Sequence, residues 1–274
     1  MKVLVTGANG YLGKGVVKEL LDKNVQVIAT DFQDHFIDKR AIIKCADLFQ
    51  LTDPFQYFEE PDVVLHMAWR DGFVHQSENH LFDLPSHYEF LRKMIDAGIK
   101  HIAVLGSMHE IGFYEGSINE TTPTNPQSLY GISKNALRNA TELLCKNHDV
   151  TFQWLRGFYI VGNTIDGSSI FSKIVQANNN QQKVFPFTMG LNQFDFIDYD
   201  DFCKGIAHTI LQDEVTGIIN ICSGTPEKLA DRVERFIKEN KFNIQLQYGA
   251  FPDRPYDSKA VWGDASKLRK ILKE

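Results

Sequence analysis

Short apolar runs alternate with longer amphipathic segments through most of the chain. The runs are rich in β-branched residues and mostly bounded by turn residues, and they lie at Lys2–Thr6, Val25–Thr30, Ile42–Lys44, Asp62–His66 and His101–Gly106. Between several of them lie segments of helical period, such as Leu12–Asp22 and His80–Ala97. This alternation predicts strand–helix–strand units that share one parallel sheet. Because the runs are almost continuously apolar, we expect helices on both faces of that sheet.

The second half of the chain is more polar. A helix is predicted from about Ser128 to Asn147, and a sixth strand at Phe152–Arg156. From Gly162 onward the sequence is polar and rich in asparagine and glutamine. The tract at Asn178–Gln182 is expected to be the exposed end of a helix and a loop. The remaining predicted elements are strands at Phe194–Ile197 and Ile218–Ile221 and helices at about Pro226–Glu239 and Ala265–Leu272. The second half is therefore expected to fold back on the first as a smaller unit.

Composition narrows the class of protein. The chain has 274 residues, 43% of them hydrophobic, and a net charge of −6, so it has residues for a full core but no basic surface of the kind that nucleic acids bind. Its four cysteines lie far apart without a C-x-x-C spacing, which predicts reduced thiols, no disulfide framework and no metal site. No signal-peptide core or apolar run of membrane-spanning length is found, so a soluble cytoplasmic protein without membrane partners is expected.

Three glycines follow the first predicted strand at the spacing of a phosphate-binding turn. Gly7, Gly10 and Gly13 form G-x-x-G-x-x-G between a strand and a helix. Gly7 allows a tight turn, Gly10 lets the backbone approach a pyrophosphate, and Gly13 lets the helix pack against the sheet. The amides at the helix N-terminus, where Tyr11 and Leu12 lie, would hold the negative charge. A glycine-rich turn without a ligand is the alternative, and the strand and helix on either side disfavour it.

An acidic residue stands where a dinucleotide-binding fold needs one. Asp31 ends the second predicted strand, about 20 residues beyond the glycines, where a carboxylate accepts hydrogen bonds from the adenosine ribose. The same carboxylate would repel a 2′-phosphate, which favours NAD over NADP, although Lys39 and Arg40 lie nearby. The alternative is a solvated aspartate at a strand end.

The motif and the alternating pattern together predict an α/β fold. We expect a Rossmann-type doubly wound parallel sheet with a small C-terminal substrate-binding subdomain. The NAD-binding domain is predicted at residues 1–162 plus about 194–224, and the substrate-binding subdomain at about 163–193 plus 225–274.

A tyrosine and a lysine lie four residues apart in the predicted helix that begins near Ser128. This spacing puts Tyr130 and Lys134 on one helical face, where the ammonium would lower the pKa of the phenol. Tyr130 could then take a proton from a carbinol as hydride leaves, or return it. Ser107, just after the fifth predicted strand, could hydrogen-bond the same substrate oxygen. The spacing alone is weak, since an exposed helical pair would look the same, but the order of all these residues favours a catalytic site.

At these residues the chain resembles the extended short-chain dehydrogenases/reductases, specifically the nucleotide-sugar epimerase/dehydratase/reductase group. The resemblance covers nearly the whole chain. The matching segments are Thr6–Gly13, Asp47 with Leu48, His66–Ala68, Ser107 with Gly112, Tyr130 with Lys134, Leu155–Arg156 with Gly162, Asp195–Asp201 and Asp264–Leu268. The resemblance implies that Asp47, Leu48, Met67 and Ala68 join the glycines and Asp31 in binding the cofactor, and that Lys134 holds the nicotinamide ribose. It also implies substrate contacts at Trp69, Arg156 and Arg254.

Departures from the family pattern sharpen the expectation. Met108 and His109 stand where dehydratases carry an acidic pair, which disfavours dehydration. His109 is either a second acid/base or a histidine that lines the site and forms a hydrogen bond with the backbone. Tyr159 replaces a usual asparagine and Phe194 a usual arginine, so the sugar or the nucleotide is expected to be unusual.

The predicted function is therefore that of an NAD(H)-dependent nucleotide-sugar epimerase or 4-ketoreductase that works through a 4-keto species. Two alternatives stay open: a reductase of a small non-nucleotide carbonyl, and a non-catalytic dinucleotide-sensing protein on the same fold. By analogy with the family, the Ser128–Asn147 helix would pair two subunits in a homodimer.

Overall fold

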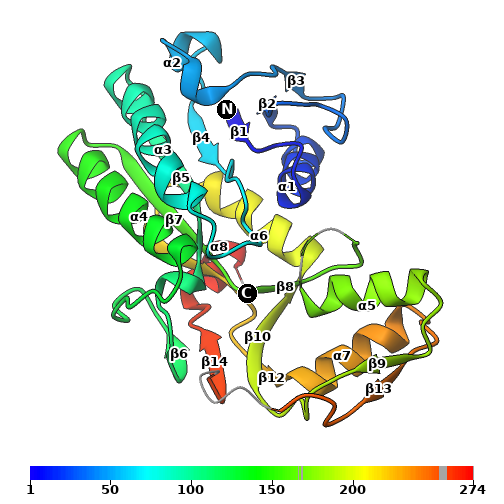
Figure 1. Ribbon diagram of the computed structural model, residues 1–274. Coiled ribbons are helices and arrows are strands. Elements are labelled where there is room, and N and C mark those ends of the chain that lie inside the picture. The colour runs from blue at the N-terminus through cyan, green and yellow to red at the C-terminus, as the bar shows by residue number, and fades with distance from the viewer. Residues whose placement is uncertain (166, 168, 253–257, 274) are drawn as a thin grey trace.

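A seven-stranded parallel sheet forms the centre of the larger part of the molecule (Figure 1). The structure is a computed structural model that describes residues 1–165, 167, 169–252 and 258–273. Across the sheet the strands are β11 (Gly217–Ile221), β7 (Thr151–Gly157), β5 (His101–Ser107), β4 (Val63–His66), β1 (Lys2–Thr6), β2 (Gln26–Thr30) and β3 (Ile42–Ile43). Neighbouring strands all run parallel. The strand order reverses between β1 and β4, and open α/β sheets bind their ligands at the carboxyl ends beside such a point. The predicted Rossmann-type fold is confirmed.

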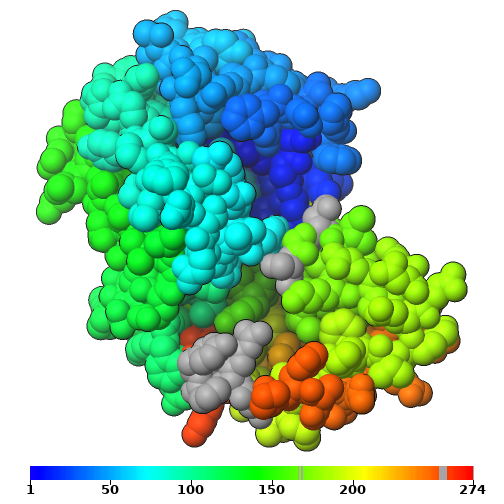
Figure 2. Space-filling model, viewed as in Figure 1, coloured from blue at the N-terminus to red at the C-terminus, as the bar shows by residue number. Residues whose placement is uncertain are grey.

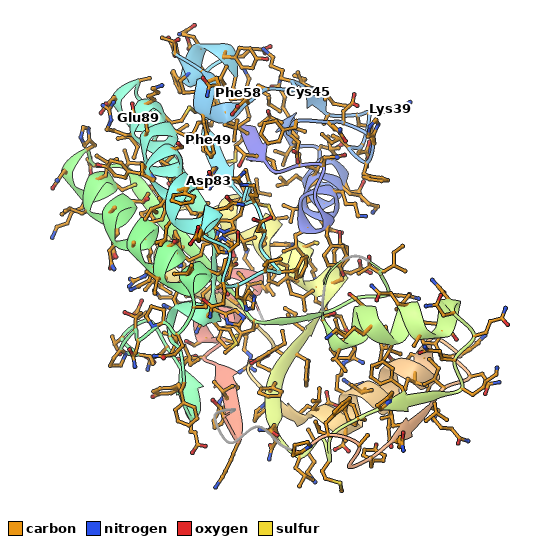
Figure 3. The ribbon with its side chains drawn as sticks, in the orientation of Figure 1. Lys39, Cys45, Phe49, Phe58, Asp83 and Glu89 are labelled. Carbon is orange, nitrogen blue, oxygen red and sulfur yellow. The ribbon has the colours of Figure 1, made fainter. Side chains whose placement is uncertain are left out.

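Helices cover both faces of this sheet, and each strand supplies side chains to two cores. One face carries α1 (Tyr11–Asp22), α6 (Tyr199–Ile210) and α8 (Ser266–Leu272), and the other carries α2 (Pro54–Tyr57), α3 (Asn79–Asp96) and α4 (Leu129–Asn147). In β1, Val3 and Val5 pack into the first core, whereas Leu4 packs into the second. Phe58 is wholly buried in the second core and Phe49 packs against it (Figure 3). Burial on both faces explains why the strand sequences are continuously apolar.

A second, smaller sheet lies beside the carboxyl end of the large one (Figure 1). Its strands are, in order, β12 (Pro226–Lys228), β10 (Gln193–Asp198), β14 (Ala260–Gly263) and β6 (Gly116–Ile118), and β8 (Tyr159–Val161) also pairs with β10. A two-stranded pair, β9 (Val184–Pro186) with β13 (Gln245–Gln247), lies near α5 (Ile170–Asn179) and α7 (Leu229–Glu239). Short 3₁₀ turns occupy Leu48–Gln50 and Met108–Glu110.

The smaller part departs from the sequence prediction in three places. Residues 226–228 form β12 before α7 begins, so the predicted helix at Pro226–Glu239 starts three residues late. β10 belongs to the small sheet, although residues 194–224 were expected in the NAD-binding domain. α8 packs against α6 and β11 of the large part, although residues 225–274 were expected in the small one. Strands of three residues are too short to show a period of two, which is why β6, β8, β9, β12 and β13 carry no readable pattern.

The two parts meet across a hollow in the surface (Figure 2). The loop between β4 and α3 reaches the segment after β8, and a Cβ atom placed on Gly167 would lie 2.9 Å from Cζ of Phe73. Within the large part, the Tyr199 hydroxyl at the start of α6 donates a hydrogen bond to the Tyr11 carbonyl at the start of α1 over 2.6 Å. The hollow therefore lies where the carboxyl ends of the large sheet face the small subdomain.

Neither a membrane span nor a metal cluster is found in the described part of the chain. No helix there is both long and apolar enough to cross a bilayer. The same residues hold no group of three or more histidine, cysteine or acidic side chains arranged to bind a metal ion. Cys145, Cys203 and Cys222 are buried free thiols, and Cys45 is an exposed one.

Candidate active site

The turn between β1 and α1 contains two glycines, Gly7 and Gly13, that leave no room for a Cβ atom. Gly7 has a φ of +69°, and a Cβ atom on it would lie 2.7 Å from the amide nitrogen of Ala68. A Cβ atom on Gly13 would lie 2.1 Å from the carbonyl oxygen of Gly7. Gly10 is the N-cap of α1 and has no side chain to cap the first turn. The loop is thus a backbone cradle at a helix N-terminus, a structure that fits a pyrophosphate.

The predicted adenosine contacts surround the ends of β1 and β2. Asp31 accepts hydrogen bonds from the Asn9 amide over 3.0 Å and from the Phe32 amide over 2.7 Å, which fixes its carboxylate beside the glycine loop. Asp47 caps the turn that begins at buried Leu48. The amides of Met67 and Ala68 both donate to the Thr6 hydroxyl, so these two residues also lie next to the loop.

The two nearby basic residues are not arranged to hold a 2′-phosphate. Arg40 forms ion pairs with Asp38 and with Asp22, both on the surface. Lys39 is exposed and lies at the outer edge of the molecule (Figure 3). This arrangement favours the predicted preference for NAD over NADP.

Ser107 and Tyr130 come together at the carboxyl end of β5. Ser107 is the last residue of β5, and its hydroxyl accepts a hydrogen bond from the His109 amide over 3.2 Å. Tyr130 lies in the first turn of α4, whose N-cap is Ser128. Burial raises the pKa of Tyr130 to about 12, although a hydrogen bond with Ser107 lowers it. The phenol is therefore protonated at neutral pH in the free protein.

Lys134 lies one helical turn after Tyr130, and its side chain is buried whereas that of Tyr130 is half-buried. Lys134 is 2% exposed, and its Nζ donates a hydrogen bond to the Leu105 carbonyl over 2.8 Å. Burial lowers the pKa of Lys134 to about 7, whereas the carboxylate of Glu110 raises it. The sequence predicted that Lys134 would lower the pKa of Tyr130, but the net shift of that pKa is upward. Desolvation is the largest cause of the pKa shift of both groups, and it opposes charge on each of them.

Two histidine rings pack beside the ring of Tyr130. The rings of His75 and His109 have centres 4.2 Å apart, and the ring of His75 stacks on that of Tyr130 at 5.3 Å with 15° between planes. Burial lowers the pKa of His109 to about 4, with a smaller contribution from His75, so His109 is neutral at pH 7. The Tyr130 amide also donates to the His75 carbonyl over 3.0 Å. The sequence missed His75 because it lies in a loop outside every recognised motif.

The three residues that were predicted to contact the substrate lie in different places. Arg156 is fully buried, its guanidinium lies 3.6 Å from the Glu110 carboxylate, and it donates to the Asn119 carbonyl. Arg156 was predicted to contact the substrate, and the structure places its side chain in the core beside Glu110. Trp69 does lie at the site, with its ring centre 6.2 Å from that of Tyr130. Arg254 falls outside the described residues.

Glu110 is a second site-supporting residue that sequence reasoning missed. It is wholly buried, and its carboxylate accepts hydrogen bonds from the Ser107 amide over 2.7 Å and from the Trp154 indole over 2.8 Å. The arginines Arg138 and Arg156 lie within 3.7 Å and 3.6 Å of the same carboxylate. This buried cluster fixes the end of β5 and therefore the position of Ser107.

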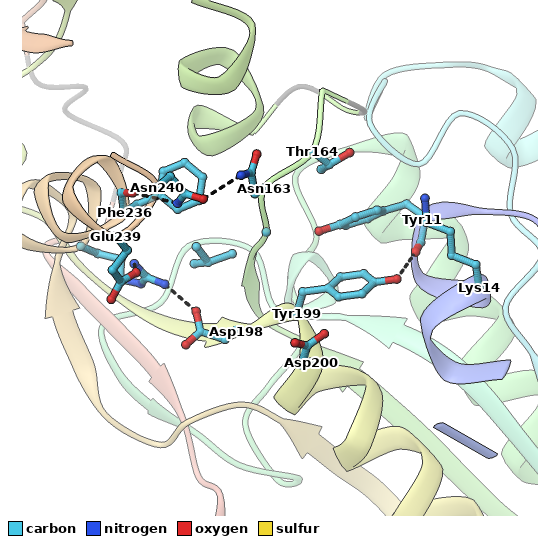
Figure 4. A pocket seen from close by; sticks show the side chains of 13 residues that line it. Tyr11, Lys14, Asn163, Thr164, Asp198, Tyr199, Asp200, Phe236, Glu239 and Asn240 are labelled. Carbon is cyan, nitrogen blue, oxygen red and sulfur yellow. Dashed lines mark hydrogen bonds and ion pairs between the residues drawn. The ribbon is translucent and has the colours of Figure 1, made fainter. Parts of the chain in front are cut away.

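A cavity of about 460 Å³ opens between α1 and α7, next to the phosphate loop (Figure 4). Tyr11 and Lys14 border it on one side, and Arg232 and Asn240 on the other. Tyr130 is not among the residues that line this cavity. Some of the lining residues are joined by hydrogen bonds. The side-chain amide of Asn163, after β8, donates to the side-chain oxygen of Asn240, after α7.

Comparison with known proteins places these features in context. The model of the NAD dependent epimerase/dehydratase family matches residues 3–222. A dTDP-6-deoxy-L-talose 4-dehydrogenase (NAD(+)) of Aggregatibacter actinomycetemcomitans is 41% identical over 269 residues, which cover 96% of this chain and 99% of that protein. A UDP-glucose 4-epimerase of Lactobacillus helveticus is 28% identical over 61% of this chain and 54% of its own length. Among solved structures, the UDP-N-acetylglucosamine 4-epimerase of Methanobrevibacter ruminantium M1 in complex with UDP-N-acetylmuramic acid has a TM-score of 0.86 and 20% identity, and the alignment covers 98% of this chain and 91% of that one.

Proposed function

Because the chain belongs to the NAD-dependent epimerase/dehydratase family, we propose that it is an NAD-dependent 4-dehydrogenase of a nucleotide-linked 6-deoxyhexose that also works in reverse as a 4-ketoreductase. The observation that carries this proposal is the 41% identity, over almost the full length of both chains, to a dTDP-6-deoxy-L-talose 4-dehydrogenase. The site supports it, since Ser107, Tyr130 and Lys134 stand together at the end of the large sheet. We place the cofactor across the glycine loop, with Asp31 at its adenosine ribose.

The chain's own residues account for the movement of the proton. When bound, NAD supplies the acceptor for the hydride that leaves C4 of the sugar. Ser107 and Tyr130 bind the C4 oxygen, and in oxidation the Tyr130 phenolate takes the hydroxyl proton as the C4–O bond becomes a carbonyl. In reduction the neutral phenol returns that proton. The charged form of Lys134 stabilises the phenolate, and Glu110 holds Ser107 in place.

Initial rates with a panel of sugar nucleotides test the proposal. We expect dTDP-6-deoxytalose to reduce NAD⁺, and dTDP-4-keto-6-deoxyhexoses to oxidise NADH, faster than the UDP-linked hexoses. An enzyme purified with tightly held NAD that inverts C4 without net NADH formation would instead be an epimerase, the second function that the sequence leaves open. If nucleoside diphosphates do not bind, the proposal fails, and turnover of small carbonyl compounds then separates the two alternatives that the sequence leaves open.

The Asp31 carboxylate should set the choice of cofactor. Replacing Asp31→Asn removes the charge and one acceptor oxygen, so we expect NAD to bind about tenfold more weakly and NADP to compete better, because charge-assisted hydrogen bonds are among the strong ones. Dissociation constants measured by calorimetry check both effects. Asp34→Asn, on the exposed loop that follows, is the matched control. An unchanged ratio of NAD to NADP affinity would show that Asp31 has no part in the selection.

We propose that two copies of the chain pair through α4, the helix that the sequence predicted by analogy, and through the neighbouring α3. Large apolar side chains are exposed on these helices, including Phe82 at 69% and Leu143 at 61%. Light scattering should give the mass of a dimer, and Leu143→Glu should lower it; a monomer at micromolar concentration would overturn the pairing. We also propose a cytoplasmic location, which cell fractionation tests.

A further inference from the structure

One backbone carbonyl does not satisfy the hydrogen-bond donors of the buried Lys134 ammonium. An ammonium has three N–H donors. In the described structure, Nζ of Lys134 donates to one carbonyl, that of Leu105. Because the group is buried, an environment that does not compensate its charge favours the neutral amine.

The second neighbour of this ammonium is an aromatic face. Nζ of Lys134 lies 3.8 Å from the ring centre of Trp69, against 6.0 Å from the ring centre of Tyr130. Indole is the aromatic group that attracts a cation most strongly, and the attraction increases when both groups are shielded from water. Trp69 is therefore placed to offset the cost of burying the charge.

The indole is fixed at its edge and on its face. Trp69 donates from Nε1 to Nδ1 of His80 over 3.0 Å, and indole nitrogen is only a donor, so Nδ1 of His80 is the acceptor. His80 must then carry its proton on Nε2, which lies 3.0 Å from the Val74 carbonyl and donates to it. The ring of His87 stacks on the indole at 4.4 Å with 14° between planes. These contacts hold Trp69 in one orientation.

Hydrogen bonding keeps the neighbouring histidines neutral. The Thr6 hydroxyl accepts from the amides of Met67 and Ala68, so its proton goes to Nδ1 of His66 over 2.9 Å. His66 then donates from Nε2 to Nδ1 of His87 over 2.8 Å. Burial lowers the pKa of His66 to about 3 and that of His87 well below its ordinary value, and Lys134 adds to both shifts.

The charged and titratable groups that face Lys134 can therefore be named. Glu110 is the anion, Tyr130 is the phenol on the same helix, and His66 and His87 are neutral rings on β4 and α3. No other cation takes the place of Lys134 in this set, so the stability of the Tyr130 phenolate depends on the charge of Lys134.

We propose that Trp69 is a positioning residue for the reaction, which holds the Lys134 side chain and keeps its ammonium charged beside Tyr130. This inference rests on the proposed function, because it assigns Tyr130 and Lys134 to proton transfer. It replaces the substrate contact that the sequence predicted for Trp69 with an action through Lys134.

The test compares Trp69→Phe and Trp69→Leu, with Trp262→Phe on the small sheet as the matched control. Loss of the indole should favour neutral Lys134, so the phenolate should form at higher pH. We expect the rise of the oxidation rate with pH to shift upward by about one pH unit in Trp69→Leu and by less in Trp69→Phe. KM for the sugar nucleotide should change little, and Trp262→Phe should match the native enzyme.

A second measurement keeps the inference separate from the proposed substrate. In the free protein, the ammonium of Lys134 is titrated by NMR of the lysine ε-carbons, and its signal is identified as the one that Lys134→Met lacks. The Lys134 titration should move to lower pH in Trp69→Leu even if no sugar nucleotide turns over. Thermal unfolding establishes that each variant is folded. An unmoved titration in both variants, or a raised KM with an unchanged pH profile, would overturn the role of Trp69.

Discussion

The Tyr130→Phe enzyme is expected to lose about 10²–10⁴-fold in kcat for both oxidation and reduction. The substitution removes one oxygen atom, the proposed proton acceptor and donor, and leaves the ring to stack on His75 and to contact His109. The loss should therefore fall on kcat, while the dissociation constant for NAD stays within about twofold of the native value, because the glycine loop and Asp31 are untouched.

Tyr88→Phe on α3 is the matched control, since it removes a phenol oxygen elsewhere on the same side of the sheet. Its kcat should equal that of the native enzyme. A native kcat in Tyr130→Phe would remove Tyr130 from the mechanism, whatever the activity of Tyr88→Phe.

The largest effect on stability is expected from Glu110→Ala, at about 3–5 kcal/mol in the free energy of unfolding. Glu110 is wholly buried and faces Arg156, which is also wholly buried. Removing the carboxylate leaves the Arg156 charge in the core without its anion and leaves the Ser107 amide and the Trp154 indole without their acceptor. Urea denaturation should show a lower midpoint with an unchanged slope.

A double variant separates loss of the ion pair from loss of volume. Glu110→Leu together with Arg156→Leu removes both charges, so it should be more stable than Glu110→Leu alone. If the double variant instead loses as much free energy of unfolding as the two single variants together, the two groups are not coupled and the explanation is wrong.

The parts of the site that the sequence predicts are those in which a local pattern meets a local backbone constraint. Gly7, Gly10 and Gly13 could be assigned because a strand, a turn without Cβ atoms and a helix follow each other directly. Tyr130 and Lys134 could be assigned because helical spacing brings them to one face. The large sheet was predictable because most of its strands are buried on both faces and are therefore continuously apolar.

What the sequence could not supply are contacts between distant segments and the effects of burial. Arg156 was expected at the substrate, yet Glu110 holds it inside the core. Lys134 was expected to lower the pKa of Tyr130, but that outcome depends on how deeply both are buried and on Trp69, which comes from another loop. Short strands such as β12 form because β10 offers them an edge, and nothing in their own residues indicates this.

The most direct measurement uses NADH that carries deuterium at its transferable position, with a dTDP-4-keto-6-deoxyhexose as the acceptor. If the account is correct, mass spectrometry and NMR will find one deuterium atom at C4 of the product sugar, and Tyr130→Phe will transfer it far more slowly. A reduced sugar without deuterium at C4, or no transfer to any nucleotide-linked 4-keto sugar, would contradict it.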